Sequence, residues 1–246
     1  MSNTPTAAML IIGNEVLSGR TADANLNYVA RRMTDVGIAL RECRVVADVE
    51  SEIADAVNAL RAKHTYVFTT GGIGPTHDDI TIASVAKAFG VPVVRNARVE
   101  EHLRKELGNK ATTATFRMAD YPEGAEPVWH GETWAPGCRM ENVFIMAGIP
   151  RVMQVMLEAA IPLLQQGPPI HARSVDAWTR ESVIAEPLGE IQARYPAVDI
   201  GSYPYRIDNR PGTTLVVRGT DLAAVEGAYA AVMGMLDGVG AELRAA

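Results

Sequence analysis

Short apolar runs alternate with helical stripes of apolar residues over the first third of the chain. The runs are residues 7–13, 38–47 and 65–70, and the first is continuously apolar up to a glycine, which is typical of a strand buried on both faces. Helical spacing appears between the runs, at Leu26, Val29, Ala30 and Met33 and then at Ile53, Ala56, Val57 and Leu60. This β-α-β-α-β order predicts a parallel sheet flanked by helices, with ligands at the carboxyl ends of the strands.

A proline and glycine cluster divides the chain in two. Residues 143–150 read as a further strand that enters a turn before a closing helix. The cluster at residues 165–169 follows, and such clusters are typical of a domain boundary. We therefore predict a large α/β domain over residues 1–166 and a small α+β domain over residues 169–246.

The composition restricts the expected partners. The net charge of -6 argues against a nucleic acid or an anionic membrane held by bulk electrostatics, and it favours a small-molecule ligand. Cys43 and Cys138 have no histidine nearby at metal-ligand spacing, so neither a disulfide framework nor a zinc site is expected. The apolar start is too short to span a membrane and lacks a basic flank, so we expect no signal peptide and a cytoplasmic protein.

The stretch TTGGIGPTHDDIT, residues 69–81, concentrates glycines and acids directly behind the third predicted strand. Glycines at a strand-to-helix junction let a phosphate approach the backbone N–H groups that open the next helix. Asp78 and Asp79 would repel that phosphate unless a divalent metal ion lay between them. In the alternative interpretation the glycines only form a turn and the two acids cap the helix, which spacing alone favours because both features are common.

The same stretch resembles the signature loop of the molybdopterin-binding (molybdenum cofactor biosynthesis) domain family. The resemblance covers about residues 7–165, and within the family it is strongest to the amino-terminal region of the competence/damage-inducible protein A group and to the corresponding domain of eukaryotic FAD synthases. Four other segments resemble family motifs in family order: IIGNEVLSGRTADAN (11–25), VVAD (45–48), YPEGAEPVWHGETWAPG (121–137) and ENVFIMAGIP (141–150).

The resemblance implies a three-layer α/β/α domain with a mostly parallel sheet, whose cleft holds a nucleotide diphosphate or a pterin phosphate. It assigns catalytic and metal-binding roles to Asp48, Asp79 and Asp78. The ligand-binding positions that it implies are Gly71, Gly72, Gly74, Pro75, Thr76 and Thr81, together with Glu15, Asn25, Gly137, Gly148 and Pro150. It also implies self-association into a homo-oligomer.

Two positions depart from the family pattern. Asn14 stands where the family has aspartate, which removes a charge that could bind metal or pterin. Ala147 replaces the first proline of the P-G-x-P turn. The small domain resembles the one that follows in the competence/damage-inducible group, and it carries neither an acid cluster nor a glycine loop, so we expect packing or dimer formation from it and no chemistry of its own.

Three functions are compatible with these motifs. The first is hydrolysis of a nucleotide pyrophosphate such as ADP-ribose or FAD, with Mg²⁺, Mn²⁺ or Co²⁺ held by the acids. The second is a protein of molybdenum cofactor biosynthesis that binds or adenylylates molybdopterin. The third is a non-catalytic nucleotide-binding module, which Asn14 would favour.

Overall fold

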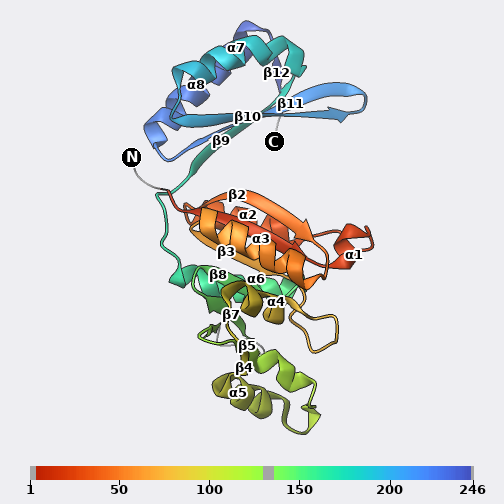
Figure 1. Cartoon of the computed structure of the whole chain (residues 1–246). Coiled ribbons are helices and arrows are strands. Elements are labelled where there is room, and N and C mark those ends of the chain that lie inside the picture. The colour runs from red at the N-terminus through yellow and green to blue at the C-terminus, as the bar shows by residue number, and fades with distance from the viewer. Residues whose placement is uncertain (1–3, 130–135, 245–246) are drawn as a thin grey trace. The chain divides into compact units, whose positions relative to one another are not determined.

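The computed structural model describes residues 4–129 and 136–244 of the chain. The chain divides into two compact units, Met1–Gly167 and Pro168–Ala246 (Figure 1). No helix within the described residues is both long and apolar enough to cross a membrane.

The first unit is built on a six-stranded sheet with the order β2-β1-β3-β8-β7-β6. β1 is parallel to β2 and β3, and β3 is parallel to β8, whereas β7 and β6 are antiparallel additions at one edge. The strand bounds are β1 Thr6–Ile12, β2 Ala39–Val46, β3 Tyr66–Thr70, β8 Val143–Met146, β7 Gly137–Met140 and β6 Glu126–Val128. The mostly parallel sheet predicted from the sequence is therefore confirmed.

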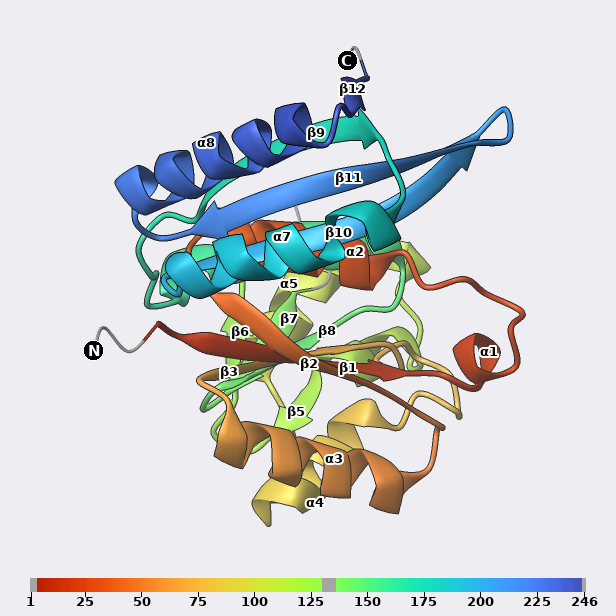
Figure 2. The ribbon, with the colours of Figure 1, turned by 90° about the horizontal axis from the view of Figure 1, so that it is seen from above.

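Alternate residues of β1 belong to two separate cores, one on each face of the sheet. Met9 and Ile11 pack with α2 (Asn25–Asp35) and α6 (Pro150–Ala160). Leu10 and Ile12 lie in the other core, which the helices α3, α4 and α5 complete, with bounds Glu50–Lys63, Thr81–Phe89 and Ala97–Leu107. Figure 2 shows α3 and α4 covering one face of the sheet. The three-layer α/β/α arrangement is confirmed by this division.

The sequence pattern does not predict several short elements. β4 (Val93–Arg95) pairs antiparallel with β5 (Asp120–Pro122) outside the main sheet. Strands this short contain too few residues to show a period of two. The other short elements are α1 (Asn14–Leu17) and the 3₁₀ helices Gly108–Lys110, Thr115–Ala119 and Ile161–Leu163.

The second unit packs two helices against a four-stranded antiparallel sheet with the order β10-β11-β9-β12. Ile184 and Ile191 of α7 meet Val225 of α8 and Leu215 of the sheet in one buried cluster. The bounds are β9 His171–Trp178, α7 Glu181–Arg194, β10 Val198–Ile207, β11 Arg210–Gly219, α8 Leu222–Gly238 and β12 Glu242–Leu243. Asp221 caps α8 by accepting hydrogen bonds from the backbone N–H groups of Ala223 and Ala224.

Candidate functional site

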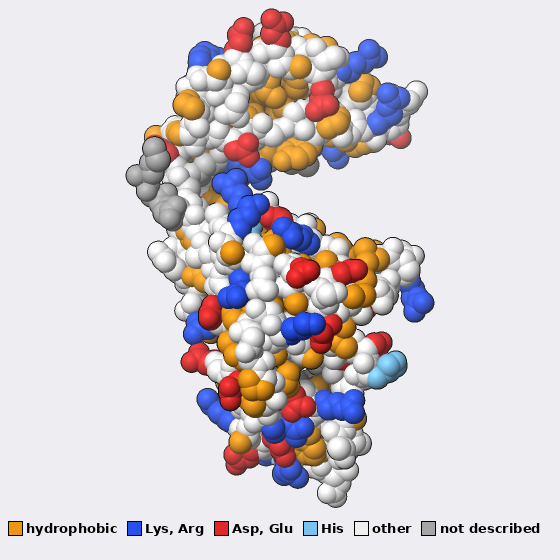
Figure 3. Space-filling view, viewed as in Figure 1, with side chains coloured by type: hydrophobic (Ala, Val, Ile, Leu, Met, Phe, Trp, Pro, Cys, Tyr) orange, Lys and Arg blue, Asp and Glu red, His pale blue; other side chains and the backbone are white. Residues whose placement is uncertain are grey.

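A cavity of about 510 Å³ opens in the first unit where β1, β3 and β8 end. Its walls include Glu15 after β1, Gly71 and Asp79 after β3, and Gly148 after β8. The carboxyl edge of a parallel sheet is where α/β folds bind ligands, and the volume suits a small molecule. On the face of the protein seen in Figure 3, acidic and basic side chains are intermixed, which gives that face no extended patch of one sign.

The glycine loop after β3 is held by contacts with β1 and with α4. Gly71 has φ 103°, and a Cβ atom there would lie 2.1 Å from the carbonyl oxygen of Ile12, so only glycine fits this position. Thr81, buried at the start of α4, donates from Oγ1 to the Gly71 oxygen at 2.8 Å and from its backbone N–H to the Gly72 oxygen at 3.0 Å. Thr81 does not line the cavity, so its role is to hold the loop in place.

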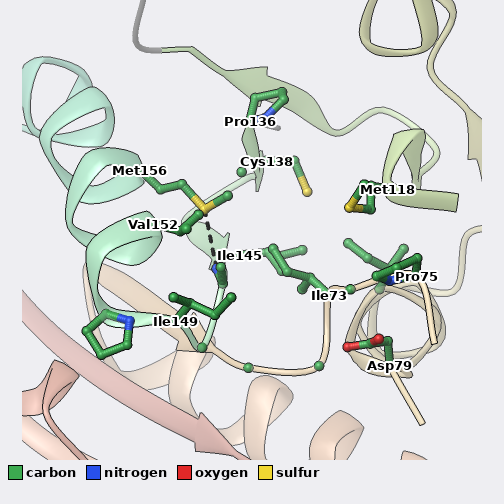
Figure 4. A pocket seen from close by; sticks show the side chains of 18 of the residues that line it. Ile73, Pro75, Asp79, Met118, Pro136, Cys138, Ile145, Ile149, Val152 and Met156 are labelled. Atoms are coloured by element: carbon green, nitrogen blue, oxygen red, sulfur yellow. Dashed lines mark hydrogen bonds between the residues drawn. The ribbon is translucent and has the colours of Figure 1, made fainter. Parts of the chain in front are cut away.

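Asp79 turns back toward the loop. Its Oδ2 accepts a hydrogen bond from the backbone N–H of Thr76 at 2.8 Å and lies beside the Thr76 hydroxyl, whose single proton is shared between Asp79 and Asp78. The first residue of α4 is Thr81, and no side chain caps this helix. The interpretation of the two acids as helix caps is therefore wrong. The Asp79 carboxylate forms part of the cavity wall beside Pro75 (Figure 4).

Asp78 is exposed to solvent. Its side chain is 69% exposed and is absent from the cavity wall. The Thr76 hydroxyl donates to its Oδ1 at 2.7 Å, and this hydrogen bond holds the pKa of the Asp78 carboxyl below its ordinary value. Thr76 thus contacts both acids without lining the cavity itself.

Asp48 has a backbone partner. Its Oδ2 accepts a hydrogen bond of 2.9 Å from the N–H of Asn14, which ties the end of β2 to the residue that opens α1. Asp48 does not line the cavity, although Glu15 does. Within the described residues, no group of three or more His, Cys, Asp or Glu side chains is placed to hold a metal ion, so the structure does not gather Asp48, Asp78 and Asp79 into one cluster.

The loop after β8 lies against the glycine loop. A Cβ atom on Gly148 would lie 3.2 Å from the Cα of Gly71, so the two backbones approach closely here. Asn25, buried in α2, donates from Nδ2 to the Gly148 oxygen at 2.8 Å and so positions this loop without lining the cavity. Of the remaining predicted ligand positions, those in the wall are Gly72, Gly74, Pro75, Gly137 and Pro150.

The inner part of the cavity is apolar, and the sequence did not reveal it. Its side chains include Met118, Cys138 and Met156, which come from a 3₁₀ helix, from β7 and from α6 (Figure 4). Burial raises the pKa of the Cys138 thiol, which keeps it neutral at physiological pH. Apolar residues on three separate elements leave no common motif, so no signal in the sequence joins them. Residues 130–135 of the predicted 121–137 segment lie outside the described part of the chain.

Comparison with protein families gives two matches that together span most of the chain. Residues 8–166 match the family described as probable molybdopterin binding domain. Residues 169–242 match the family described as FAD synthase, middle domain.

Individual relatives agree with these matches. A protein of Archaeoglobus fulgidus is 32% identical over 208 residues, which cover 85% of this chain and 87% of the relative. A CinA-like protein of Frankia casuarinae is 34% identical over 204 residues, which cover 75% of this chain and 47% of the relative. Among solved structures, the protein CinA with unknown function from Thermoplasma acidophilum has a TM-score of 0.60 at 30% identity, covering 65% of this chain and 98% of that one.

Proposed function

This chain belongs to the family of probable molybdopterin-binding domains, as its motifs indicated, and we propose that its first unit hydrolyses the diphosphate bond of a nucleotide such as ADP-ribose or FAD with the help of a divalent metal ion. Water would add across the P–O–P linkage, and the two products would be monophosphates. The support comes from the glycine loop and the Asp79 carboxylate, which line one cavity of nucleotide size.

The observation that carries the proposal is a run of unused backbone donors in the glycine loop. Among the described residues, the N–H groups of Gly72, Ile73 and Gly74 have no hydrogen-bond acceptor. All three residues lie in the cavity wall, and the loop meets the amino terminus of α4 where the N–H of Thr81 donates to the Gly72 oxygen. Consecutive free N–H groups near a helix amino terminus suit phosphate oxygens, because the helix dipole also favours negative charge there.

The charged side chains of the cavity wall are acidic, so a bound phosphate would need a cation beside it. The charged residues found among the described wall residues are Glu15 and Asp79, and neither lysine nor arginine accompanies them. A diphosphate placed there would be repelled by Asp79 unless a metal ion lay between them. Asp79 and the Thr76 hydroxyl beside it offer oxygen ligands only, which is the type of donor that Mg²⁺ shares with substrate phosphates. When bound, the ion would neutralise charge on the phosphate oxygens.

Protein residues would do the remaining work. The loop N–H groups would orient the diphosphate, and Thr81 and Asn25 would keep the two loops rigid through their hydrogen bonds to Gly71 and Gly148. Asp48 enters this proposal as a positioning residue, because its carboxylate holds the Asn14 N–H. The apolar inner wall would bind a flat ring of the nucleotide and exclude water from it.

The alternative function is binding of a phosphorylated pterin or nucleotide without hydrolysis, as in a molybdopterin-binding or adenylylating protein. It is favoured by the separation of the acids, since Asp48 is engaged by Asn14 and Asp78 points into solvent. Both functions use the glycine loop, so only a measurement of turnover separates them.

Incubation of the purified full chain with ADP-ribose and FAD, each with Mg²⁺, Mn²⁺ or Co²⁺, tests the proposal. We expect chromatography to resolve the two monophosphate products in the presence of at least one metal, and EDTA to abolish their formation. Ligand binding, by calorimetry, without products under any of these conditions would contradict hydrolysis and support the alternative.

A further inference from the structure

One backbone donor in the cavity wall has only a weak acceptor. The N–H of Ala147 points to the Sδ of Met156 at 3.3 Å, the dashed line in Figure 4. Both residues line the cavity, and the described residues provide this N–H with no other acceptor. A thioether sulfur is a weak acceptor, so an oxygen atom of a ligand would form a better hydrogen bond with the same N–H.

The identity of residue 147 creates this donor. In the motif that this segment resembles, proline stands at this position, and proline carries no backbone N–H. Ala147 follows directly on β8, and its N–H belongs to the loop that packs against Gly71 through Gly148. The departure from the motif therefore adds a hydrogen-bond donor to the cavity.

The surroundings indicate which kind of oxygen would accept this hydrogen bond. Pro136, Ile145 and Val152 form the nearby wall, and the described wall residues include no lysine or arginine. A phosphate would lack a counter-charge in this apolar part, whereas a neutral carbonyl oxygen needs none. Two other sulfur-bearing side chains, Met118 and Cys138, also line the cavity, and sulfur makes favourable contacts with aromatic rings.

We propose that the Ala147 N–H binds a carbonyl oxygen on an aromatic ring of the ligand, and that the Met156 thioether occupies this N–H until the ligand arrives. Met156 lines the cavity and has three rotatable side-chain bonds, so its sulfur would move aside by rotation when the ligand binds. This inference rests on the proposed function only in taking the same cavity as the binding site. It adds that a nucleotide with a ring carbonyl is preferred over one without.

Two nucleosides without phosphate separate this inference from the hydrolysis proposal. Guanosine carries a ring carbonyl, and 2-aminopurine riboside has the same skeleton without it. In NMR titrations without metal, we expect the wild-type protein to bind guanosine more tightly by about tenfold, the value of one hydrogen bond. Equal affinity for the two nucleosides, or binding of neither, would overturn the inference. Failure of hydrolysis has no bearing on this comparison.

Substitution of residue 147 tests the donor itself. Ala147→Pro removes the N–H, and the preceding Met146 lies in a strand, the conformation that a residue before proline favours. We expect this variant to lose the preference for guanosine and to bind 2-aminopurine riboside as before. Ala147→Gly keeps the N–H and should keep the preference. A proline variant that still prefers guanosine would disprove the role of this donor.

Met156→Leu gives an independent test if the proline variant does not fold. Leucine has nearly the volume of methionine but no sulfur, so it leaves the Ala147 N–H without a competing acceptor. We expect guanosine to bind a few-fold more tightly to this variant, by roughly the strength of a weak hydrogen bond, while 2-aminopurine riboside changes little. Weaker binding of guanosine would show that the sulfur contacts the ligand. It would contradict the role of the sulfur as a temporary acceptor for the Ala147 N–H.

Discussion

Asp79→Asn is expected to give a folded protein whose metal-dependent hydrolysis is about a hundredfold slower. Asparagine has a side-chain oxygen that can still accept the hydrogen bond from the Thr76 N–H, so the loop should keep its shape. The substitution removes the negative charge that the proposed metal ion needs in the cavity wall. Turnover measured over a metal titration, with thermal unfolding alongside, checks both parts of the expectation.

Asp78→Asn is the matched control for Asp79→Asn. Asp78 is hydrogen-bonded to the same Thr76 hydroxyl but is 69% exposed and lies outside the cavity wall. Its substitution should therefore slow hydrolysis much less. Wild-type turnover of the Asp79→Asn protein at every metal concentration would remove Asp79 from the mechanism, and equal loss in both variants would place the metal ion outside the cavity.

Gly71→Ala is expected to lower the free energy of unfolding by roughly 3 kcal/mol or more. The new Cβ would lie 2.1 Å from the Ile12 oxygen, a main-chain atom of β1 that cannot rotate away, and φ at this residue is 103°. The loop must then shift away from β1, and ligand binding should be lost with it. Urea denaturation followed by circular dichroism measures the change in stability.

Gly90→Ala is the control for Gly71→Ala, because it measures the cost of a positive φ without the close approach found at Gly71. Gly90 ends α4 with φ 69°, and a Cβ atom there would meet nothing within 4 Å. We expect a loss of only about 1 kcal/mol, the ordinary cost of a side chain in the left-handed region. Equal losses for the two variants would mean that the contact between Gly71 and Ile12 does not constrain the loop.

The sequence predicted the sheet and its layers because the residues of β1 are apolar on both faces of the strand. Its continuous apolar run marks a strand buried on two faces, and the structure places Met9 and Leu10 in opposite cores. The position of the glycine loop was predictable for a related reason. Residues 71–80 lie between a strand and a helix, so the chain must turn there, and glycine adopts the positive φ values that tight turns use.

The partners of the acids could not be predicted. Spacing places Asp78 and Asp79 before a helix, but it does not show that Asp79 would turn back to Thr76 and leave α4 without a cap. The hydrogen bond from Asn14 to Asp48 joins residues 34 positions apart, and it depends on how two loops meet at the sheet edge. Local periodicity carries no information on such contacts.

The apolar part of the cavity was equally inaccessible to the sequence. Met118 lies in a 3₁₀ helix of five residues, too short to show a period, and Met156 belongs to a helix whose apolar stripe is explained by the core alone. β7, which supplies Cys138, has only four residues and pairs antiparallel with β8. Three elements had to be placed in space before these sulfur atoms could be seen to share one cavity.

A crystal structure of the full chain with FAD and Mg²⁺ tests the central claim most directly. We expect phosphate groups, from the substrate or its products, within hydrogen-bonding distance of the N–H groups of Gly72, Ile73 and Gly74, with the metal ion between a phosphate oxygen and Asp79. A nucleotide whose phosphates lie away from this loop, with these three N–H groups still free, would contradict it.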